Sequence, residues 1–258
     1  MTPTRNPTVT IAPGVEMPLV GFGTWQANGR DALRALEAGY RHIDTATMYG
    51  NEDQIGRALR DSGLARSDVF VTTKLPAENA GRERETIDAS LAALGLDHVD
   101  LWLIHWPPDG HASTEIWQRF VEIAEEGLTR AIGVSNYDAA QIDEITEATG
   151  VAPAVNQIPW SPALYDAAVV AAHRARGVTL EGYSPFKTSD LNDPVLTEIA
   201  ERHGVTARQV VLRWHVEHEF VVIPKSSDPE RIAANFDVFG FSLDATDVAR
   251  IDALGRPA

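Results

Sequence analysis

The chain has 258 residues, of which 44% are hydrophobic and 23% charged, and this ordinary globular composition excludes collagen, coiled coil and extensive disorder. A net charge of −15 disfavours nucleic acid and anionic membrane surfaces as partners. No apolar run approaches the ~18 residues of a membrane-spanning helix, and the lack of cysteine excludes disulfides and thiolate metal sites.

The N-terminal region carries a turn signal and no export signal. Residues 1–6 are polar and no apolar stretch of the secretory type follows them, so we expect a cytoplasmic protein. Strand-like runs at 8–11 and 17–20 flank the pair Pro13-Gly14, which is typical of a tight turn. We expect a β-hairpin that closes the bottom of the fold.

Eight short β-rich runs follow, separated by helical patterns. They cover residues 19–25, 42–46, 69–75, 99–106, 130–135, 154–158, 179–184 and 220–224. Apolar residues at helical spacing between them, such as Ile55 with Leu59 and Ile116 with Phe120, predict amphipathic helices. The last interval holds two helical patterns, 193–203 and 206–218, and a final helix is expected over 244–254.

Strands that alternate with helices every ~25–30 residues indicate parallel βαβ units. Eight such units predict a (β/α)8 TIM barrel of class α/β, a single domain over residues 1–258 with an N-terminal β-hairpin cap and extra C-terminal helices. A doubly wound open sheet is the alternative.

In such a barrel the functional groups lie at the carboxyl ends of the strands. The second, third and fourth runs carry Asp44, Lys74 and His105 there, and Tyr49 follows in a loop. Neighbouring strands are ~4.8 Å apart, so the first three side chains should lie within about 10 Å of one another. An ammonium lowers the pKa of a nearby tyrosine. The four groups therefore predict a general acid beside an electrophilic pocket, as carbonyl reduction by hydride requires.

Each of these residues also has a structural interpretation. Asp44 and Lys74 could be a structural ion pair, His105 a core histidine and Tyr49 a surface tyrosine. Their conjunction at three adjacent strand ends favours function. His215 and His218 are interpreted as a solvent-facing helix pair, and no metal site is expected.

Three motifs resemble those of the aldo-keto reductases. The first is Gly-Tyr-Arg-His-Ile-Asp-Thr-Ala at 39–46 with Tyr49 after it, and the second is Arg-Ala-Ile-Gly-Val-Ser-Asn-Tyr at 130–137. The third is Ile-Pro-Lys-Ser at 223–226 with Arg231 and Asn235. The short loop at 107–113 makes the chain similar to the bacterial, short-loop type that includes 2,5-diketo-D-gluconate reductases.

The resemblance implies a barrel that binds NADPH/NADP+ without a Rossmann fold, and the chain indeed has no G-x-G-x-x-G motif. It implies that Tyr49 is the proton donor, that Lys74 and Asp44 tune it, and that His105 orients the carbonyl. The implied cofactor contacts are Gly23, Thr24, Asp44, Ser135, Asn136, Gln157, Tyr183, Ser184, Lys187, Lys225, Ser226, Arg231 and Asn235.

Within that set the resemblance implies three subsites. Ser135, Asn136 and Gln157 would hold the nicotinamide carboxamide, with Tyr183 stacked on the ring. The 2′-phosphate would lie against Lys225, Ser226 and Arg231, and the adenine against Asn235. Lys187 stands where relatives often have a glycine-bearing loop, so we hypothesise that it contacts the pyrophosphate; a solvent-facing lysine is the alternative.

The short loop at 107–113 predicts an open substrate pocket with Trp25, Met48 and Trp106 as its apolar walls, although the two tryptophans could instead fill the core. The sequence thus predicts a monomeric, NADP-dependent oxidoreductase that reduces aldehydes and small ketones to alcohols, with a small-molecule carbonyl substrate as its partner. An NADP(H)-binding sensor with little turnover is the main alternative. A phosphate-handling isomerase is disfavoured by the acidic charge.

Overall fold

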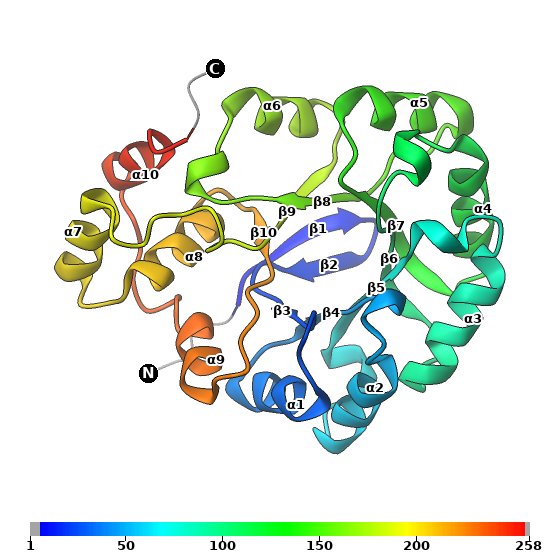
Figure 1. Cartoon of the computed structure of the whole chain (residues 1–258), viewed down its shortest axis with the longest axis horizontal. Helices are drawn as coiled ribbons and strands as arrows, with labels where there is room; N and C mark the ends of the chain where they lie inside the picture. The colour runs from blue at the N-terminus through cyan, green and yellow to red at the C-terminus, as the bar shows by residue number, and fades with distance from the viewer. Residues whose placement is uncertain (1–5, 256–258) are drawn as a thin grey trace.

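The computed structural model describes residues 6–255. Its first element is the expected antiparallel hairpin, β1 (Thr8–Ala12) with β2 (Val15–Pro18), which lies across one end of the barrel (Figure 1). Among these described residues, no helix has both the length and the apolar character that crossing a membrane demands.

Eight parallel strands form the barrel, and each is hydrogen-bonded to the next in chain order. They are β3 (Phe22–Gly23), β4 (His42–Asp44), β5 (Phe70–Leu75), β6 (Val99–Ile104), β7 (Thr129–Ser135), β8 (Val155–Pro159), β9 (Thr179–Tyr183) and β10 (Val221–Val222). A parallel bridge between Val20 and Val222 joins the first strand to the last. The (β/α)8 prediction is confirmed, and the alternative of an open doubly wound sheet is wrong.

The seam between β3 and β10 explains why both strands are shorter than their predicted runs. The Gly21 N–H donates to the Val222 carbonyl at 2.9 Å, and the Val222 N–H donates to Leu19 at 2.8 Å. A Cβ on Gly23 would lie 2.9 Å from the Ile223 carbonyl oxygen. At Gly23 the two backbones therefore approach more closely than a side chain would allow.

In the part of the chain that the structure describes, ten α-helices surround the strands (Figure 1). They are α1 (Gly29–Ala38), α2 (Glu52–Asp61), α3 (Glu83–Leu94), α4 (Thr114–Glu125), α5 (Ala139–Thr149), α6 (Ala167–Ala175), α7 (Pro194–His203), α8 (Ala207–Glu217), α9 (Pro229–Phe236) and α10 (Ala245–Asp252). Capping boxes at Asn28, Asp138 and Thr206 fix where α1, α5 and α8 begin. The predicted apolar faces are buried, as Ile55 and Ile116 show.

The expectation of a solvent-facing histidine pair on α8 is wrong. His215 is fully buried, and its imidazole lies against the position where a Cβ on Gly182 of β9 would be. His218 is half-buried, and its Nε2 lies 2.8 Å from Asp252. Helix α8 contacts α7, α9, α10 and β10, so more of its circumference is covered than a one-faced surface helix would show.

The bottom of the barrel is held by one buried carboxylate. Asp100, at the start of β6, accepts hydrogen bonds from Arg66 at 2.7 Å, from Arg130 at 2.9 Å and from the Val71 N–H at 2.8 Å. Arg130 also donates to the Gly14 carbonyl at 2.8 Å. This cluster, the Asp100 cluster, therefore ties three strands and the hairpin turn together.

Candidate active site

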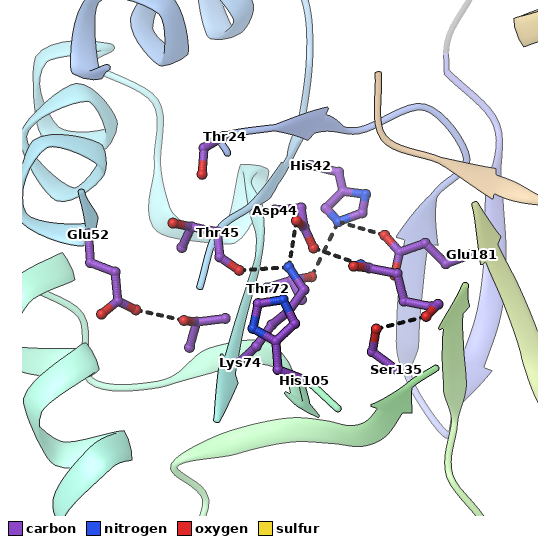
Figure 2. A network of polar contacts seen from close by, with 12 residues as sticks. Thr24, His42, Asp44, Thr45, Glu52, Thr72, Lys74, His105, Ser135 and Glu181 are labelled. Carbon is purple, nitrogen blue, oxygen red and sulfur yellow. Dashed lines mark hydrogen bonds and ion pairs between the residues drawn. The ribbon is translucent and has the colours of Figure 1, made fainter. Parts of the chain in front are cut away.

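At the opposite end of the barrel, β4 and β5 carry a buried ion pair. The fully buried Lys74 Nζ lies 2.6 Å from Asp44 Oδ1 and donates to the Thr45 carbonyl at 2.8 Å (Figure 2). The other Asp44 oxygen accepts a hydrogen bond from the Gln157 amide at 2.8 Å. Both carboxylate oxygens are thus occupied, and the ammonium is fixed in place at the strand ends.

Tyr49 lies above this pair. It belongs to a short helix, η1 (Thr47–Tyr49), which is held to β5 by a 2.9 Å hydrogen bond from Thr47 to the Lys74 carbonyl. The Lys74 Nζ is 5.2 Å from the centroid of the Tyr49 ring, and the His105 ring is 5.7 Å away with an interplanar angle of 72°. The four residues predicted from three strand ends and a loop therefore meet at one place, and Tyr49 is half-buried rather than a free surface side chain.

Burial decides the protonation states of these groups. Burial raises the pKa of Tyr49 although the Lys74 ammonium opposes this, so the expected net lowering is wrong and the phenol holds its proton at neutral pH. Burial, and next the Lys74 charge, lower the pKa of His105 to about 3, so its imidazole is neutral. Burial disfavours the Lys74 ammonium, but the negative charges around it, that of Asp44 first among them, together raise the pKa of Lys74.

The ends of β7, β8 and β9 form a continuous amide and hydroxyl network. Ser135 Oγ donates to the Gln157 carbonyl at 2.8 Å, and the Asn136 amide donates to Ser135 Oγ at 2.9 Å and to the His105 carbonyl at 3.1 Å. The Tyr183 hydroxyl donates to Asn136 Oδ1 at 2.9 Å. The predicted nicotinamide residues are therefore contiguous with one another and, through Gln157, with Asp44.

Two residues of this edge have strained backbones. Asn136 has φ 65° and Ser184 has φ 55°, values that non-glycine residues rarely adopt. Each directly follows the last residue of its strand, Asn136 after β7 and Ser184 after β9. Strained residues cluster where the surrounding structure serves a ligand or a reaction, which agrees with the position of these two.

The loop between β10 and α9 carries the predicted phosphate residues. Lys225 and Arg231 are exposed, and neither forms an ion pair within residues 6–255. The Asp228 carboxylate, which sequence reasoning missed, caps α9 by accepting the N–H groups of Glu230 and Arg231 at 2.9 and 3.1 Å. Ser226 Oγ accepts the Asp228 N–H at 3.1 Å, and Asn235 is buried.

Lys187 lies in the loop after β9 and is exposed. The neighbouring Phe186 packs under the Arg208 guanidinium, whose carbon lies 4.7 Å from the ring centroid. The contact anchors the loop to α8 but leaves the role of Lys187 a prediction.

The three predicted apolar walls are exposed large hydrophobic residues. Trp25 is 59% exposed, Met48 54% and Trp106 48%. Trp25 follows β3, Met48 lies in η1 and Trp106 follows β6. All three are therefore at the same end of the barrel as Tyr49. The alternative in which the tryptophans fill the core is wrong for both.

Two interior groups were missed by sequence reasoning. His42 and Glu181 are fully buried and face each other beside the Asp44–Lys74 pair (Figure 2), with His42 Nε2 3.8 Å from Glu181 Oε1. A glutamate inside the apolar run of β9 was the available signal, because a charged residue in a buried strand is uncommon. Gly21 makes room for the imidazole, since a Cβ there would lie 2.4 Å from His42 Nδ1.

Comparisons with known proteins identify the family. The model of the Aldo/keto reductase family matches residues 19–256. An aldo-keto reductase of Mycolicibacterium smegmatis is 44% identical, covering 96% of this chain and 94% of the relative. Morphine 6-dehydrogenase of Pseudomonas putida is 42% identical (97% and 92% covered), and methylglyoxal reductase DkgA of Escherichia coli is 38% identical (97% and 94%).

Solved structures give the same result. An aldo/keto reductase from Brucella melitensis is similar with a TM-score of 0.92 and 41% identity, over 96% of this chain and 99% of that one. A putative 2,5-diketo-D-gluconic acid reductase B gives 0.91 and 37%, over 98% and 93%. A Bombyx mori aldo-keto reductase in complex with NADP gives 0.90 and 32%, over 97% and 93%. The barrel, the strand-end tetrad and the family match together show that this chain belongs to the aldo/keto reductase family of oxidoreductases.

Proposed function

We propose that the chain catalyses the NADPH-dependent reduction of aldehydes and small ketones to alcohols. The observation that carries the proposal is the meeting of Tyr49, Lys74 and His105 at the rim, with Asp44 holding the ammonium at 2.6 Å. The cofactor would supply the hydride. The four side chains supply the hydrogen bond and the proton that stabilise the carbonyl oxygen as it gains negative charge.

Each side chain has a distinct task in this proposal. The neutral imidazole of His105 orients the carbonyl oxygen by a hydrogen bond. Tyr49, which burial keeps protonated, donates its proton to that oxygen. The Lys74 ammonium stabilises the phenolate left behind, and Asp44 is a positioning residue that fixes Lys74. A general acid of this kind contributes roughly 10²–10⁴-fold to a rate.

The residues at the rim fit a nicotinamide dinucleotide phosphate. Thr24 Oγ1 and His105 Nδ1 are buried without a hydrogen-bond partner among the described residues, so polar atoms at the rim are free for a ligand. Ser135, Asn136 and Gln157 would hold the carboxamide, beside Tyr183, Gly23 and Ser184. Lys225, Ser226 and Arg231 would take the 2′-phosphate, Asn235 the adenine and Lys187 the pyrophosphate. The relative crystallised with NADP supports this cofactor.

The exposed Trp25, Met48 and Trp106 would form the walls of an open pocket. Exposed apolar side chains gathered beside polar catalytic groups are typical of a ligand site. The names of two relatives, a methylglyoxal reductase and a morphine 6-dehydrogenase, support carbonyl compounds and alcohols as the substrate class.

The test is NADPH consumption by the purified protein with an aromatic aldehyde, methylglyoxal, a keto acid and a diketo sugar acid. Wild type should turn over at least one of them, and Tyr49→Phe should lose ~10²-fold or more while keeping its NADPH affinity. Tight NADPH binding with no turnover on any of the four would contradict the reductase and favour a sensor.

A further inference from the structure

Glu181 stands out among the buried carboxyl groups because it has no hydrogen-bond donor. It lies on β9 inside the barrel, its exposure is 0%, and both of its oxygens lack a partner within residues 6–255. By contrast, buried Asp44, Asp100 and Glu52 all receive hydrogen bonds. A bare carboxylate at such a place would cost several kcal/mol.

Each group that faces Glu181 is either uncharged or already hydrogen-bonded to another group. On β5, Lys74 gives its ammonium to Asp44 and the Thr45 carbonyl. On β8, the register partner Gln157 gives its amide to Asp44 at 2.8 Å. On β10, the register partner is apolar Val221.

The remaining neighbour is His42 on β4, whose Nε2 lies 3.8 Å from Glu181 Oε1, beyond hydrogen-bond reach. That nitrogen is instead 3.3 Å from Thr72 Oγ1. Burial lowers the pKa of His42 to about 4, although Asp44 opposes this, so the imidazole carries no charge at neutral pH. Among residues 6–255, the cation that acts on Glu181 is therefore Lys74, which already pairs with Asp44 and only partly offsets the cost of an ionised Glu181.

We infer that Glu181 is a neutral carboxylic acid in the resting enzyme, and that its ionisation at alkaline pH places a negative charge in the barrel beside the Asp44–Lys74–Tyr49 group. It is a positioning residue, because it acts on Tyr49 and Lys74 without touching a reactant. With the acid form, the four interior groups Asp44, Lys74, His42 and Glu181 are neutral in sum; with the ionised form they are negative.

The direction of titration agrees with this geometry. Burial, and next the charge of Asp44, raise the pKa of Glu181 to about 8, and they outweigh the Gln157 amide and the Lys74 charge, which lower it. A carboxyl group whose pKa is raised on folding binds its proton more tightly in the native state than in the unfolded one. Its contribution to stability is therefore complete below about pH 4.5, its ordinary pKa, and is lost as the pH rises towards 8.

The first test needs no cofactor. Thermal unfolding of wild type and Glu181→Gln is measured from pH 5 to pH 9. The quantity of interest is the difference between the two melting temperatures, because the contributions of the buried histidines are common to both proteins. The melting temperature of the variant relative to that of wild type should rise with pH, by on the order of 5 °C or more. Asp100→Asn, the control, removes a carboxylate with two guanidinium partners and should stay below wild type at neutral pH. A difference between the two proteins that does not change with pH, or that moves in favour of wild type as the pH rises, would overturn the inference.

The second test rests on the proposed function. The oxidised nicotinamide is a cation and the reduced form is not, so the charge of Glu181 should favour NADP+. Between pH 7 and pH 9 the ratio of the NADPH to the NADP+ dissociation constant, from fluorescence quenching, should rise on the order of tenfold in wild type. It should stay flat in Glu181→Gln. A wild-type ratio that matches the variant at every pH would refute the effect on the cofactor, whereas failure of either cofactor to bind would instead refute the proposed function.

Discussion

The two ends of the barrel treat buried charge in opposite ways. At the bottom, Asp100 is surrounded by two guanidinium groups and a backbone N–H, so every demand of the carboxylate is met. At the top, Lys74 and Asp44 satisfy each other, but Glu181, His105 Nδ1 and Thr24 Oγ1 have no hydrogen-bond partner among residues 6–255. The bottom uses charge to fix the structure, and the top retains unsatisfied groups beside the proposed reaction. The difference teaches that a buried carboxylate fully supplied with donors is typical of a structural role, whereas a buried carboxylate without donors beside a reactive group points to a functional role.

The strongest way to test that comparison is Lys74→Met. It removes the cation from the top and leaves Asp44 buried with only the Gln157 amide. Turnover should fall by ~10²–10⁴-fold, and the free energy of unfolding should drop by about 3–5 kcal/mol. NADPH consumption and urea unfolding measure the two effects. Turnover close to that of wild type would show that the ion pair is structural only.

A second test concerns the rim charges that have no carboxylate partner. Replacing Lys225 and Arg231 together by alanine should weaken NADPH binding by roughly 10–100-fold and NADH much less, because only NADPH carries the 2′-phosphate. Stability should change by less than about 0.5 kcal/mol, since both side chains are exposed. Equal weakening of both cofactors would refute the phosphate assignment.

Asp228 offers a matched control for that experiment. Asp228→Ser keeps a residue that caps α9 and removes the negative charge beside Lys225 and Arg231. It should therefore tighten NADPH binding while leaving NADH binding unchanged, the opposite of the double variant. The dissociation constants from fluorescence quenching decide between them.

The smallest effect on function is expected at the bottom. Asp100→Asn should reduce the free energy of unfolding by about 1–3 kcal/mol, because the hydrogen bonds to Arg66 and Arg130 are weakened. Turnover per folded molecule should stay unchanged. A loss of turnover without a loss of stability would show that the two ends of the barrel are coupled.

Much of this architecture could be predicted from sequence because the rules involved are local. Apolar runs that end in Asp44, Lys74 and His105 place these residues at strand ends, and a closed barrel brings neighbouring strand ends together. The lengths of the two strands at the seam were overestimated. How far these strands pair depends on the closure of the barrel, where Gly23 lies against Ile223.

What sequence could not give depends on burial in three dimensions. The direction of the Tyr49 pKa shift was predicted wrongly, because the effect of burial exceeds that of the ammonium. His215 was placed in solvent because helical periodicity alone does not show that α8 is covered on several sides. Glu181 was missed because the sequence does not show that the amide of the neighbouring Gln157 donates its hydrogen bond to Asp44.

The seam between β3 and β10 has a consequence for the dynamics of the barrel. Each of these strands has two residues and a single bridge completes the ring, whereas β5 and β6 pair over four residues. Local opening should therefore begin at the seam, and the amide protons of Gly21 and Val222 should exchange with deuterium before those of Thr73 and Leu103. Trp25 and Lys225 extend from its two edges. Breathing of the seam would thus move Trp25, a proposed substrate contact, and Lys225, a proposed phosphate contact, apart in one step.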